Sequence, residues 1–309
     1  MSVAGPAVLA LDVGGTHVRC GLVRHGRVVE RRSAAWPAPR SAAEELAFVA
    51  ALARDLAPHA EAAGVSLAAL TDEAGVVVEW PNRPHWRGAA VRRRLEDALE
   101  APVVIEDDAN AAALGEWASG AGRGHRHGLF VVAGTGIGAG LVLDGRLYRG
   151  ARGFAGELGH TCVEADGPPC RCGRRGCLQA LASGGALDRI AAERGLAGAA
   201  ALAAAASAGD AAAALAIRSA AVVLGRAVAN VVVLLDLEVV VVGGGSSHSG
   251  ELWWAALREA FASRLPARTT AVLSPAVLGD DACLLGAAHL AQERLLPRRA
   301  VAVGLGEPA

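Results

Sequence analysis

One segment sets the fold class of this chain, and it reads Ile105-Glu106-Asp107-Asp108-Ala109-Asn110-Ala111-Ala112-Ala113-Leu114-Gly115-Glu116. It follows the apolar run 102–105, which predicts a short buried strand, and it leads into an alanine-rich helix former. Two carboxylates therefore fall at a strand-to-helix turn, the edge of an open α/β sheet where ligands bind. Taken alone, the pattern favours Asp108 as a simple helix N-cap, because capped helices far outnumber active sites.

The composition excludes several classes of protein. The chain has 309 residues, 53% of them hydrophobic, and a formal net charge of −1, which predicts a large core in two lobes and no nucleic-acid partner. All 30 basic residues are arginine, so Schiff-base chemistry, a P-loop and a lysine-dependent kinase site are excluded. The apolar run 227–242 contains Asp236 and Glu238, and a strand begins too early for a signal peptide, so we expect no membrane span and a cytoplasmic location.

Glycine-containing motifs recur at a fixed spacing of 119 positions. The recurring pairs are Gly15-Thr16 with Gly134-Thr135, Gly21-Leu22-Val23 with Gly140-Leu141-Val142, and Gly26-Arg27 with Gly145-Arg146. Such a repeat predicts two homologous lobes that each open with a hairpin, the first between strands 7–13 and 18–23. A plain hairpin turn is the alternative for each glycine pair. Two Gly-Thr turns would also offer backbone N–H groups and a hydroxyl to a polyphosphate without any lysine.

The remaining pattern predicts an alternation of helices and strands. Ser41 and Glu44 form a capping box for a helix over 41–63. Two prolines exclude regular structure over 80–86, where we expect an aromatic-rimmed loop that serves as a substrate wall. A buried strand over 238–242 ends at Gly243-Gly244-Gly245, where an adenine and ribose could approach the backbone. Other expected elements are strands 65–70 and 76–78 and helices 87–99, 250–261 and 281–295.

Three of the six cysteines lie within eight positions, at Cys170, Cys172 and Cys177. In a chain without an export signal this clustering favours a metal site over disulfides. With His160 they supply the four nitrogen and sulfur ligands of a closed tetrahedral zinc site. A lone histidine would more often be a structural hydrogen-bonding residue, but the three cysteines behind it favour zinc.

The motifs together resemble the ROK family of repressors, open reading frames and sugar kinases, over nearly the whole chain. The matching stretches are Asp12-x-Gly14-Gly15-Thr16, Glu106-x-Asp108 through Glu116, 134–140, Glu157-x-Gly159-His160, Cys170-x-Cys172-Gly173 and 243–245. The resemblance implies an α/β, actin-like ATPase (ribonuclease H-like) fold with two lobes around a nucleotide cleft. We expect a small lobe over 1–119, joined by the helix 281–295, and a large lobe over 120–280 with the zinc site.

The resemblance also implies the roles of individual residues in phosphorylation of a sugar hydroxyl by ATP with Mg²⁺. Asp108 would be the general base. Asp12 would orient the hydrated magnesium ion. The phosphates would be bound by Gly14, Gly15, Thr16, Gly134, Thr135 and Gly136, and the nucleoside by Gly243, Gly244 and Gly245. The acceptor would be bound by Ala69, Asn82, Asp107, Glu157, His160 and Gln179. One ring nitrogen of His160 would ligate zinc while the other binds the sugar. A homodimer is the expected assembly.

Three positions depart from the pattern of the family's kinases. They are Asp107 in place of Asn, Ala68-Ala69 in place of Pro-Gly, and Gln179 in place of Glu. Because the phosphate turns and the base are kept, we expect an active kinase that prefers an amino sugar or a cyclitol to glucose. A sugar-binding regulator without catalysis is the alternative. Family repressors carry an N-terminal helix-turn-helix, and in this chain the phosphate motif begins at residue 12, which leaves no room for one.

Overall fold

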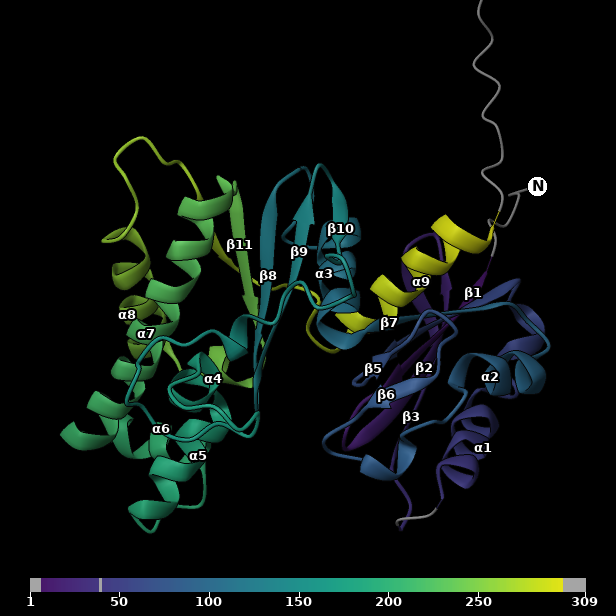
Figure 1. The fold of residues 1–309 in the computed structure, drawn as a ribbon, viewed down its shortest axis with the longest axis horizontal. Helices are drawn as coiled ribbons and strands as arrows, with labels where there is room; N and C mark the ends of the chain where they lie inside the picture. Colours follow the sequence, from purple (N-terminus) through teal and green to yellow (C-terminus); the bar gives the residue numbers. More distant parts are fainter. Residues whose placement is uncertain (1–6, 39–40, 297–309) are drawn as a thin grey trace, which may run out of the picture. The chain divides into compact units, whose positions relative to one another are not determined.

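Both halves of the chain fold on a five-stranded sheet with the same strand arrangement (Figure 1). The computed structural model describes residues 7–38 and 41–296. Unit 1 contains the described residues up to Glu106 and those from Ala287 onward, and unit 2 runs from Asp107 to Gly286. In each unit a three-stranded antiparallel meander is followed by two further strands on the other side of its first strand.

The sheet of unit 1 has the order β3-β2-β1-β4-β7, with β1 and β4 parallel. Every residue of β1 and β4 is buried, and these strands form the apolar centre of the unit together with α1 and α2. The elements are β1 Val8–Val13, β2 His17–Arg24, β3 Arg27–Ala35, α1 Ala42–Ala53, β4 Ala62–Leu67, β5 Leu70–Thr71, β6 Val77–Glu79, α2 Val91–Leu99 and β7 Val103–Asp107.

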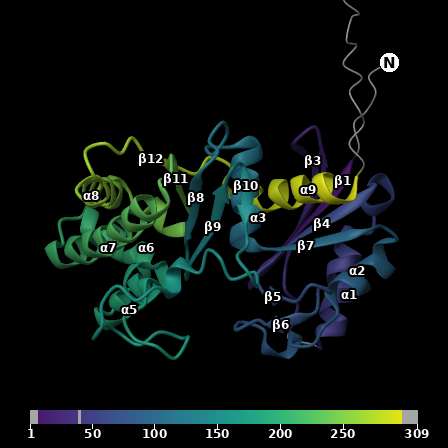
Figure 2. The same ribbon diagram turned by 45° about the horizontal axis from the view of Figure 1, so that its top comes forward.

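The sheet of unit 2 has the order β10-β9-β8-β11-β12, with β11 parallel to both β8 and β12. Its main core lies between this sheet and the helices α4 to α8. Figure 2 shows α7 running along α8 within this layer. The elements are α3 Asp108–Ser119, β8 Gly128–Ala133, β9 Ile137–Leu143, β10 Arg146–Tyr148, α4 Leu178–Ala182, α5 Gly184–Glu193, α6 Ala199–Ser207, α7 Ala211–Leu235, β11 Val239–Gly243, α8 Glu251–Ala262, β12 Val272–Pro275 and α9 Ala282–Leu295, the last ending in unit 1.

The strand registers explain the spacing of the sequence repeat. In unit 1, Val13 pairs with Val18, and in unit 2, Ala133 pairs with Ile137. The second hairpin therefore has one residue fewer in its turn. The first strands of the two hairpins lie 120 positions apart and the second strands 119 apart. The predicted internal repeat is confirmed, and its offset comes from the shorter turn.

Helix α3 packs within unit 2, so the structural division falls at Glu106 and not at residue 119. The reason is close backbone contact with β9. A Cβ on Gly140 would lie 2.5 Å from the Cβ of Ala113, and one on Gly138 would lie 3.1 Å from that of Ala109. Side chains at the two glycines would push α3 off the sheet. Asp107 and Asp108 consequently belong to unit 2.

Three expected elements have clearly different bounds in the structure. The helix predicted over 41–63 ends at Ala53, followed by a short 3-10 turn over Ala57–His59, although its Ser41 and Glu44 capping box is present as predicted. The strand predicted over 65–70 is β4, which already begins at Ala62. The helix predicted from residue 87 begins at Val91. Alanine favours helices, but the alanines near residue 62 lie between β1 and β7, where burial overrides that propensity.

Helix α7 is long and apolar enough to cross a membrane by length and composition. Half of its most apolar window is buried inside unit 2, and it packs closely against α8. Its buried face includes Ile217, Leu224 and Val232, which belong to the main core of the unit. The apolar length of α7 is therefore explained by its position as a core helix of unit 2.

A buried carboxylate, Glu45 of α1, ties α1 to the loop after β6. Its side chain is fully buried and accepts a hydrogen bond from Arg83 Nη1 at 2.7 Å. His85 Nε2 lies 2.9 Å from its second oxygen, to which the indole N–H of Trp86 also donates. Burial opposes ionisation of Glu45, but the bonds from Trp86, His85 and Arg83 outweigh it and hold its pKa below the usual value.

We expect Glu45→Gln to lower the free energy of unfolding by about 2 to 4 kcal/mol at pH 7, because the amide leaves the buried Arg83 without its counter-ion. Since the folded pKa of Glu45 is depressed, its contribution is complete above the unfolded pKa of about 4.3 and is lost as the pH falls through the folded value. Urea denaturation of both proteins between pH 3 and 7 measures this. A stability gap that stays constant below pH 4 would contradict the assignment.

Candidate functional site

The first glycine turn joins β1 to β2 and is held through its carbonyl oxygens. The Gly14 oxygen accepts the indole N–H of Trp36 at 2.8 Å, and the Thr16 oxygen accepts the backbone N–H of Trp36 at 3.3 Å. The Gly15 oxygen accepts a longer bond from Arg83 at 3.4 Å. In a trans peptide the C=O and the following N–H point in opposite directions. The amides of Gly15, Thr16 and residue 17 therefore face away from these partners, as an anion-binding turn requires.

Asp12 precedes this turn at the end of β1 and is buried. One carboxylate oxygen accepts from Arg19 Nη1 at 3.1 Å and the other from the hydroxyl of Ser66 at 3.2 Å. These bonds fix the carboxylate and partly neutralise its charge. The arrangement suits contact with water on a magnesium ion better than direct coordination of the ion.

The second glycine turn joins β8 to β9 in unit 2 and is held by backbone amides. Gly134 O accepts the N–H of Gly184 at 2.7 Å, and Thr135 O accepts the N–H of Gly185 at 3.2 Å. Both donors belong to the first turn of α5, whose N-cap is Ser183. By the same peptide geometry, the amides of Thr135 and Gly136 point away from α5.

The glycine-rich end of β11 lies against the end of β8, next to this second turn. Gly244 has φ 87°, and a Cβ there would lie 2.6 Å from the Ala133 oxygen, so only glycine fits. Ser246 follows in the 3-10 turn over Gly245–His248, and its buried hydroxyl has no hydrogen-bond partner among the described residues. Unit 2 thus gathers the predicted residues 134–136 and 243–245 at one edge of its sheet.

The two adjacent carboxylates at the junction of β7 and α3 have different positions relative to the helix. Asp107 is the N-cap of α3, and its side-chain oxygen accepts the amides of Ala109 at 3.0 Å and Asn110 at 3.4 Å. Asp108 is the first residue of α3 and is half-buried. The capping role therefore belongs to Asp107. At the start of a helix the macrodipole favours an ionised carboxylate, which is the form that accepts a proton.

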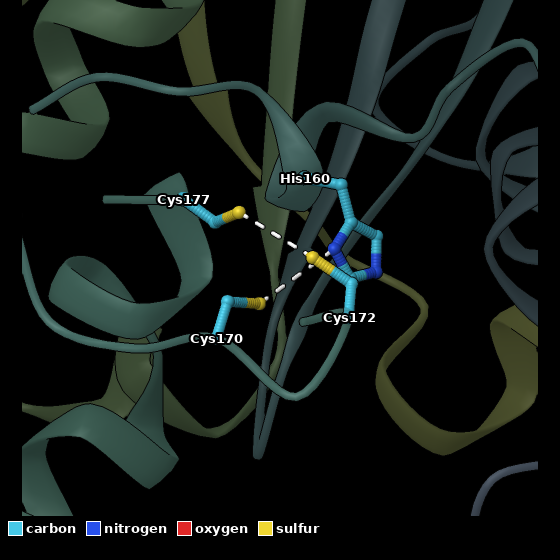
Figure 3. A group of neighbouring side chains, drawn as sticks. All are labelled: His160, Cys170, Cys172 and Cys177. Atoms are coloured by element: carbon cyan, nitrogen blue, oxygen red, sulfur yellow. Dashed lines mark hydrogen bonds between the residues drawn. The ribbon is translucent and has the colours of Figure 1, made fainter. Parts of the chain in front are cut away.

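His160, Cys170, Cys172 and Cys177 converge in unit 2 with all four ligand atoms within 4.8 Å of one another (Figure 3). Cys170 Sγ lies 3.8 Å from His160 Nδ1, and Cys172 Sγ lies 3.6 Å from Cys177 Sγ. Sulfur ligands about 2.3 Å from a tetrahedral metal ion lie about 3.8 Å apart. Both the donor set and its spacing therefore fit a closed tetrahedral metal site.

The loop that carries these cysteines depends on glycine and on Arg174. Gly176 has φ 67°, and a Cβ there would overlap the Glu164 oxygen at 1.5 Å. Arg174 donates to the His160 carbonyl at 3.0 Å. Hydrogen bonds from the backbone and side chain of Arg174 lower the pKa of Cys172 to about 6, the direction that favours a metal-binding thiolate.

Three of the predicted acceptor residues of unit 2, Glu157, His160 and Gln179, lie in or beside the His160 and cysteine cluster. His160 Nδ1 faces Cys170, while Nε2 lies 3.8 Å from a carboxylate oxygen of the exposed Glu157. The two ring nitrogens thus face different protein partners. The amide of Gln179 donates to Cys170 Sγ at 3.2 Å, and its oxygen would lie 3.0 Å from a Cβ on Gly136. Gln179 therefore lies between the cluster and the second glycine turn.

The predicted acceptor residues of unit 1 are Ala69 and Asn82. Ala69 is buried after β4, and the exposed Asn82 has its amide nitrogen 3.4 Å from the position of a Cβ on Gly15. The aromatic rim expected in the loop 80–86 is wrong, since Trp80 and Trp86 are fully buried and pack edge to face at 4.8 Å. Their large apolar rings serve the core of unit 1.

Sequence reasoning missed the groups that hold the two glycine turns. Ser183 followed by two glycines is a readable N-cap signal for α5 that could have been found. Trp36 and Arg83 carry no such signal, because they lie 22 and 68 positions from the carbonyls that they bind.

Comparison with known proteins agrees with this arrangement. Residues 8–294 match the model of the ROK family. The glucokinase of Thermotoga maritima is 35% identical over 93% of this chain and 98% of its own, and the N-acetylmannosamine kinase of Citrobacter koseri is 36% identical over 93% and 99%. A ROK family glucokinase from Streptomyces griseus, solved with glucose and AMPPNP, superposes with a TM-score of 0.80 at 32% identity over 93% of this chain and 99% of that one.

These matches confirm the predicted actin-like ATPase fold, which the identical strand orders of the two units also show. They cover nearly the full length of each relative, so no large part of the compared proteins lies outside the match. The chain belongs to the ROK family of sugar kinases and related proteins.

Proposed function

We propose that this protein is an ATP-dependent kinase that phosphorylates a hydroxyl group of a sugar or sugar-like molecule. The observation that carries the proposal is Asp108 at the first position of α3, in a chain whose two glycine turns both present backbone amides. Relatives named glucokinase and N-acetylmannosamine kinase support the same activity.

Asp108 and the two glycine turns would have separate roles in the reaction. The acceptor hydroxyl forms a new O–P bond to the γ-phosphorus while the bond from that phosphorus to the β,γ-bridging oxygen breaks, and ADP leaves. Asp108 takes the hydroxyl proton. Because the transition state is loose, the turns at 14–16 and 134–136 contribute mainly by positioning the phosphates and offsetting their charge. Magnesium would neutralise charge on the phosphates, with Asp12 binding its water shell.

Zinc is the metal that we propose for His160, Cys170, Cys172 and Cys177. It would serve as a structural ion, because four protein ligands leave no open position. Its effect on the acceptor would pass through His160, whose Nδ1 faces the cluster while Nε2 points toward Glu157. Both Nε2 and the Glu157 carboxylate would then bind sugar hydroxyls.

We expect the acceptor to be an amino sugar or a cyclitol in preference to glucose. Asp107 offers acceptors only, and one of its oxygens is engaged at the N-cap of α3. Gln179 supplies no carboxylate, and its amide N–H points to Cys170. Pockets that leave a buried polar group unpaired reject the wrong substrate strongly. Values of kcat/KM for glucose, glucosamine, N-acetylmannosamine and cyclitols with ATP measure this preference, and preferential phosphorylation of glucose would contradict it.

A sugar-binding regulator without catalysis is the second candidate function. The same acceptor screen separates the two. A kinase shows ADP formation that depends on the acceptor, whereas a regulator shows acceptor-dependent thermal stabilisation without ADP formation. We further propose a cytoplasmic homodimer that binds no nucleic acid. Light scattering of the purified protein tests the dimer.

A further inference from the structure

Side chains from two distant loops fix the backbone of the first glycine turn in unit 1. Trp36 follows β3 and Arg83 lies in the loop after β6. Between them they bind the oxygens of Gly14 and Gly15. In unit 2 the matching turn is held by the backbone amides of Gly184 and Gly185, which do not depend on a side chain. The two turns therefore differ in how far they depend on particular side chains.

The two terminal nitrogens and one face of the Arg83 guanidinium group contact protein partners, while its buried Nε has no hydrogen-bond partner among the described residues. Nη1 donates to Glu45 at 2.7 Å, Nη2 donates to the Gly15 oxygen at 3.4 Å, and the face of the group lies 4.0 Å from the centre of the Trp36 ring. Only 12% of the Arg83 side chain is exposed, and that of Glu45 is fully buried. A group held in this way is not positioned to bind a ligand directly. Its role is instead to hold the Gly15 carbonyl of the turn in place.

Because the peptide bond is planar and trans, the contact between Arg83 and the Gly15 oxygen also fixes the direction of the next N–H group in the turn. The Gly15 carbonyl and the Thr16 amide belong to one trans peptide, so fixing the oxygen on Arg83 points the Thr16 N–H in the opposite direction. The Trp36 indole does the same for the Gly15 N–H through the Gly14 oxygen. These two amides are the ones that the proposed function assigns to phosphate.

We propose that Arg83 is a positioning residue for nucleotide binding, which holds the Gly15 peptide in the orientation that presents the Thr16 amide to phosphate. Glu45 and Trp36 fix Arg83 in place. This inference rests on the proposed role of residues 14–16 in binding ATP phosphates. It adds a residue that touches neither nucleotide nor acceptor.

The test is the affinity for AMPPNP without acceptor, measured by calorimetry on Arg83→Lys and Trp36→Phe. Lysine keeps one charge beside Glu45 but lacks the planar fork that reaches the Gly15 oxygen at the same time. Phenylalanine keeps a ring under Arg83 and removes the donor to Gly14. We expect Kd to rise about 3- to 10-fold in each variant, the effect of losing one hydrogen bond to the turn. KM for ATP should rise with it, while kcat at saturating ATP stays close to that of the wild type.

Arg258→Lys is the matched control. Arg258 also pairs with a glutamate, Glu251, at 3.0 Å and lies 5.3 Å from the ring centre of Trp254, but on the exposed face of α8. It should bind AMPPNP as the wild type does. A folded Arg83→Lys variant with wild-type Kd would overturn the proposal, as would an equal change in Arg258→Lys. A wild type that binds AMPPNP but phosphorylates no acceptor would instead contradict the proposed function and leave the binding comparison valid.

Discussion

Asp108→Asn is expected to lower kcat by about 10²- to 10⁴-fold, the usual effect of removing a general base. Asparagine preserves the size and the helix position of Asp108 but cannot take the proton of the attacking hydroxyl. Nucleotide affinity should stay near the wild-type value, because the carboxylate acts on the acceptor. Steady-state kinetics with the best acceptor, together with calorimetry of AMPPNP, measure both quantities.

Glu251→Gln provides a control for the loss of a carboxylate at a helix start. Glu251 is the first residue of α8, as Asp108 is of α3, and the exchange is equally conservative. Its kcat should match that of the wild type. Near-normal turnover of Asp108→Asn would reduce Asp108 to a first-turn residue that merely interacts with the helix dipole, and the mechanism would then need another base.

The local sequence pattern correctly predicted those helices and strands in which the burial of the residues follows the hydrophobic periodicity of the sequence. The hairpin strands, the strand before Asp107 and the final helix lie within about two residues of their expected bounds, which is the ordinary uncertainty of an element's ends. The helix over 41–63 was too long because the alanines that precede Gly64 favour helix in isolation. Their strand is set by tertiary contact. A Cβ on Gly64 would lie 1.9 Å from the Ala287 oxygen of α9, so the sheet and α9 meet there through bare backbone.

The candidate site was predictable where its chemistry lies in contiguous residues. Glycine turns, the Asp107-Asp108 pair and the cysteine cluster are all short motifs whose residue types reveal their role. The supports of these motifs come from elsewhere in the chain. The cap at Asp107 depends on which of two equivalent carboxylates starts α3, and the contact of Gln179 with Cys170 depends on the fold of the whole loop. Such choices follow from three-dimensional packing, which spacing alone does not encode.

The second large effect is expected from the metal site. Protein purified without added metal should contain one zinc ion per chain, and Cys177→Ser should lose it. Because metal binding and folding of the loop are linked, the free energy of unfolding should fall by several kcal/mol, on the order expected for loss of part of a structural zinc site. Elemental analysis and thermal denaturation of the two proteins measure this.

Cys162→Ser separates the metal site from the loop around it. Cys162 forms a backbone bridge with Cys177 yet lies outside the four-residue cluster, and it is exposed. Its substitution should leave zinc content and stability unchanged. Cys177→Ser should in addition weaken acceptor binding while AMPPNP affinity is retained, since the proposed zinc ion would orient His160 and would have no contact with nucleotide. Zinc-free wild-type protein would show that the four residues do not form a metal centre, and equal zinc loss in both variants would contradict the specific assignment of Cys177 as a ligand.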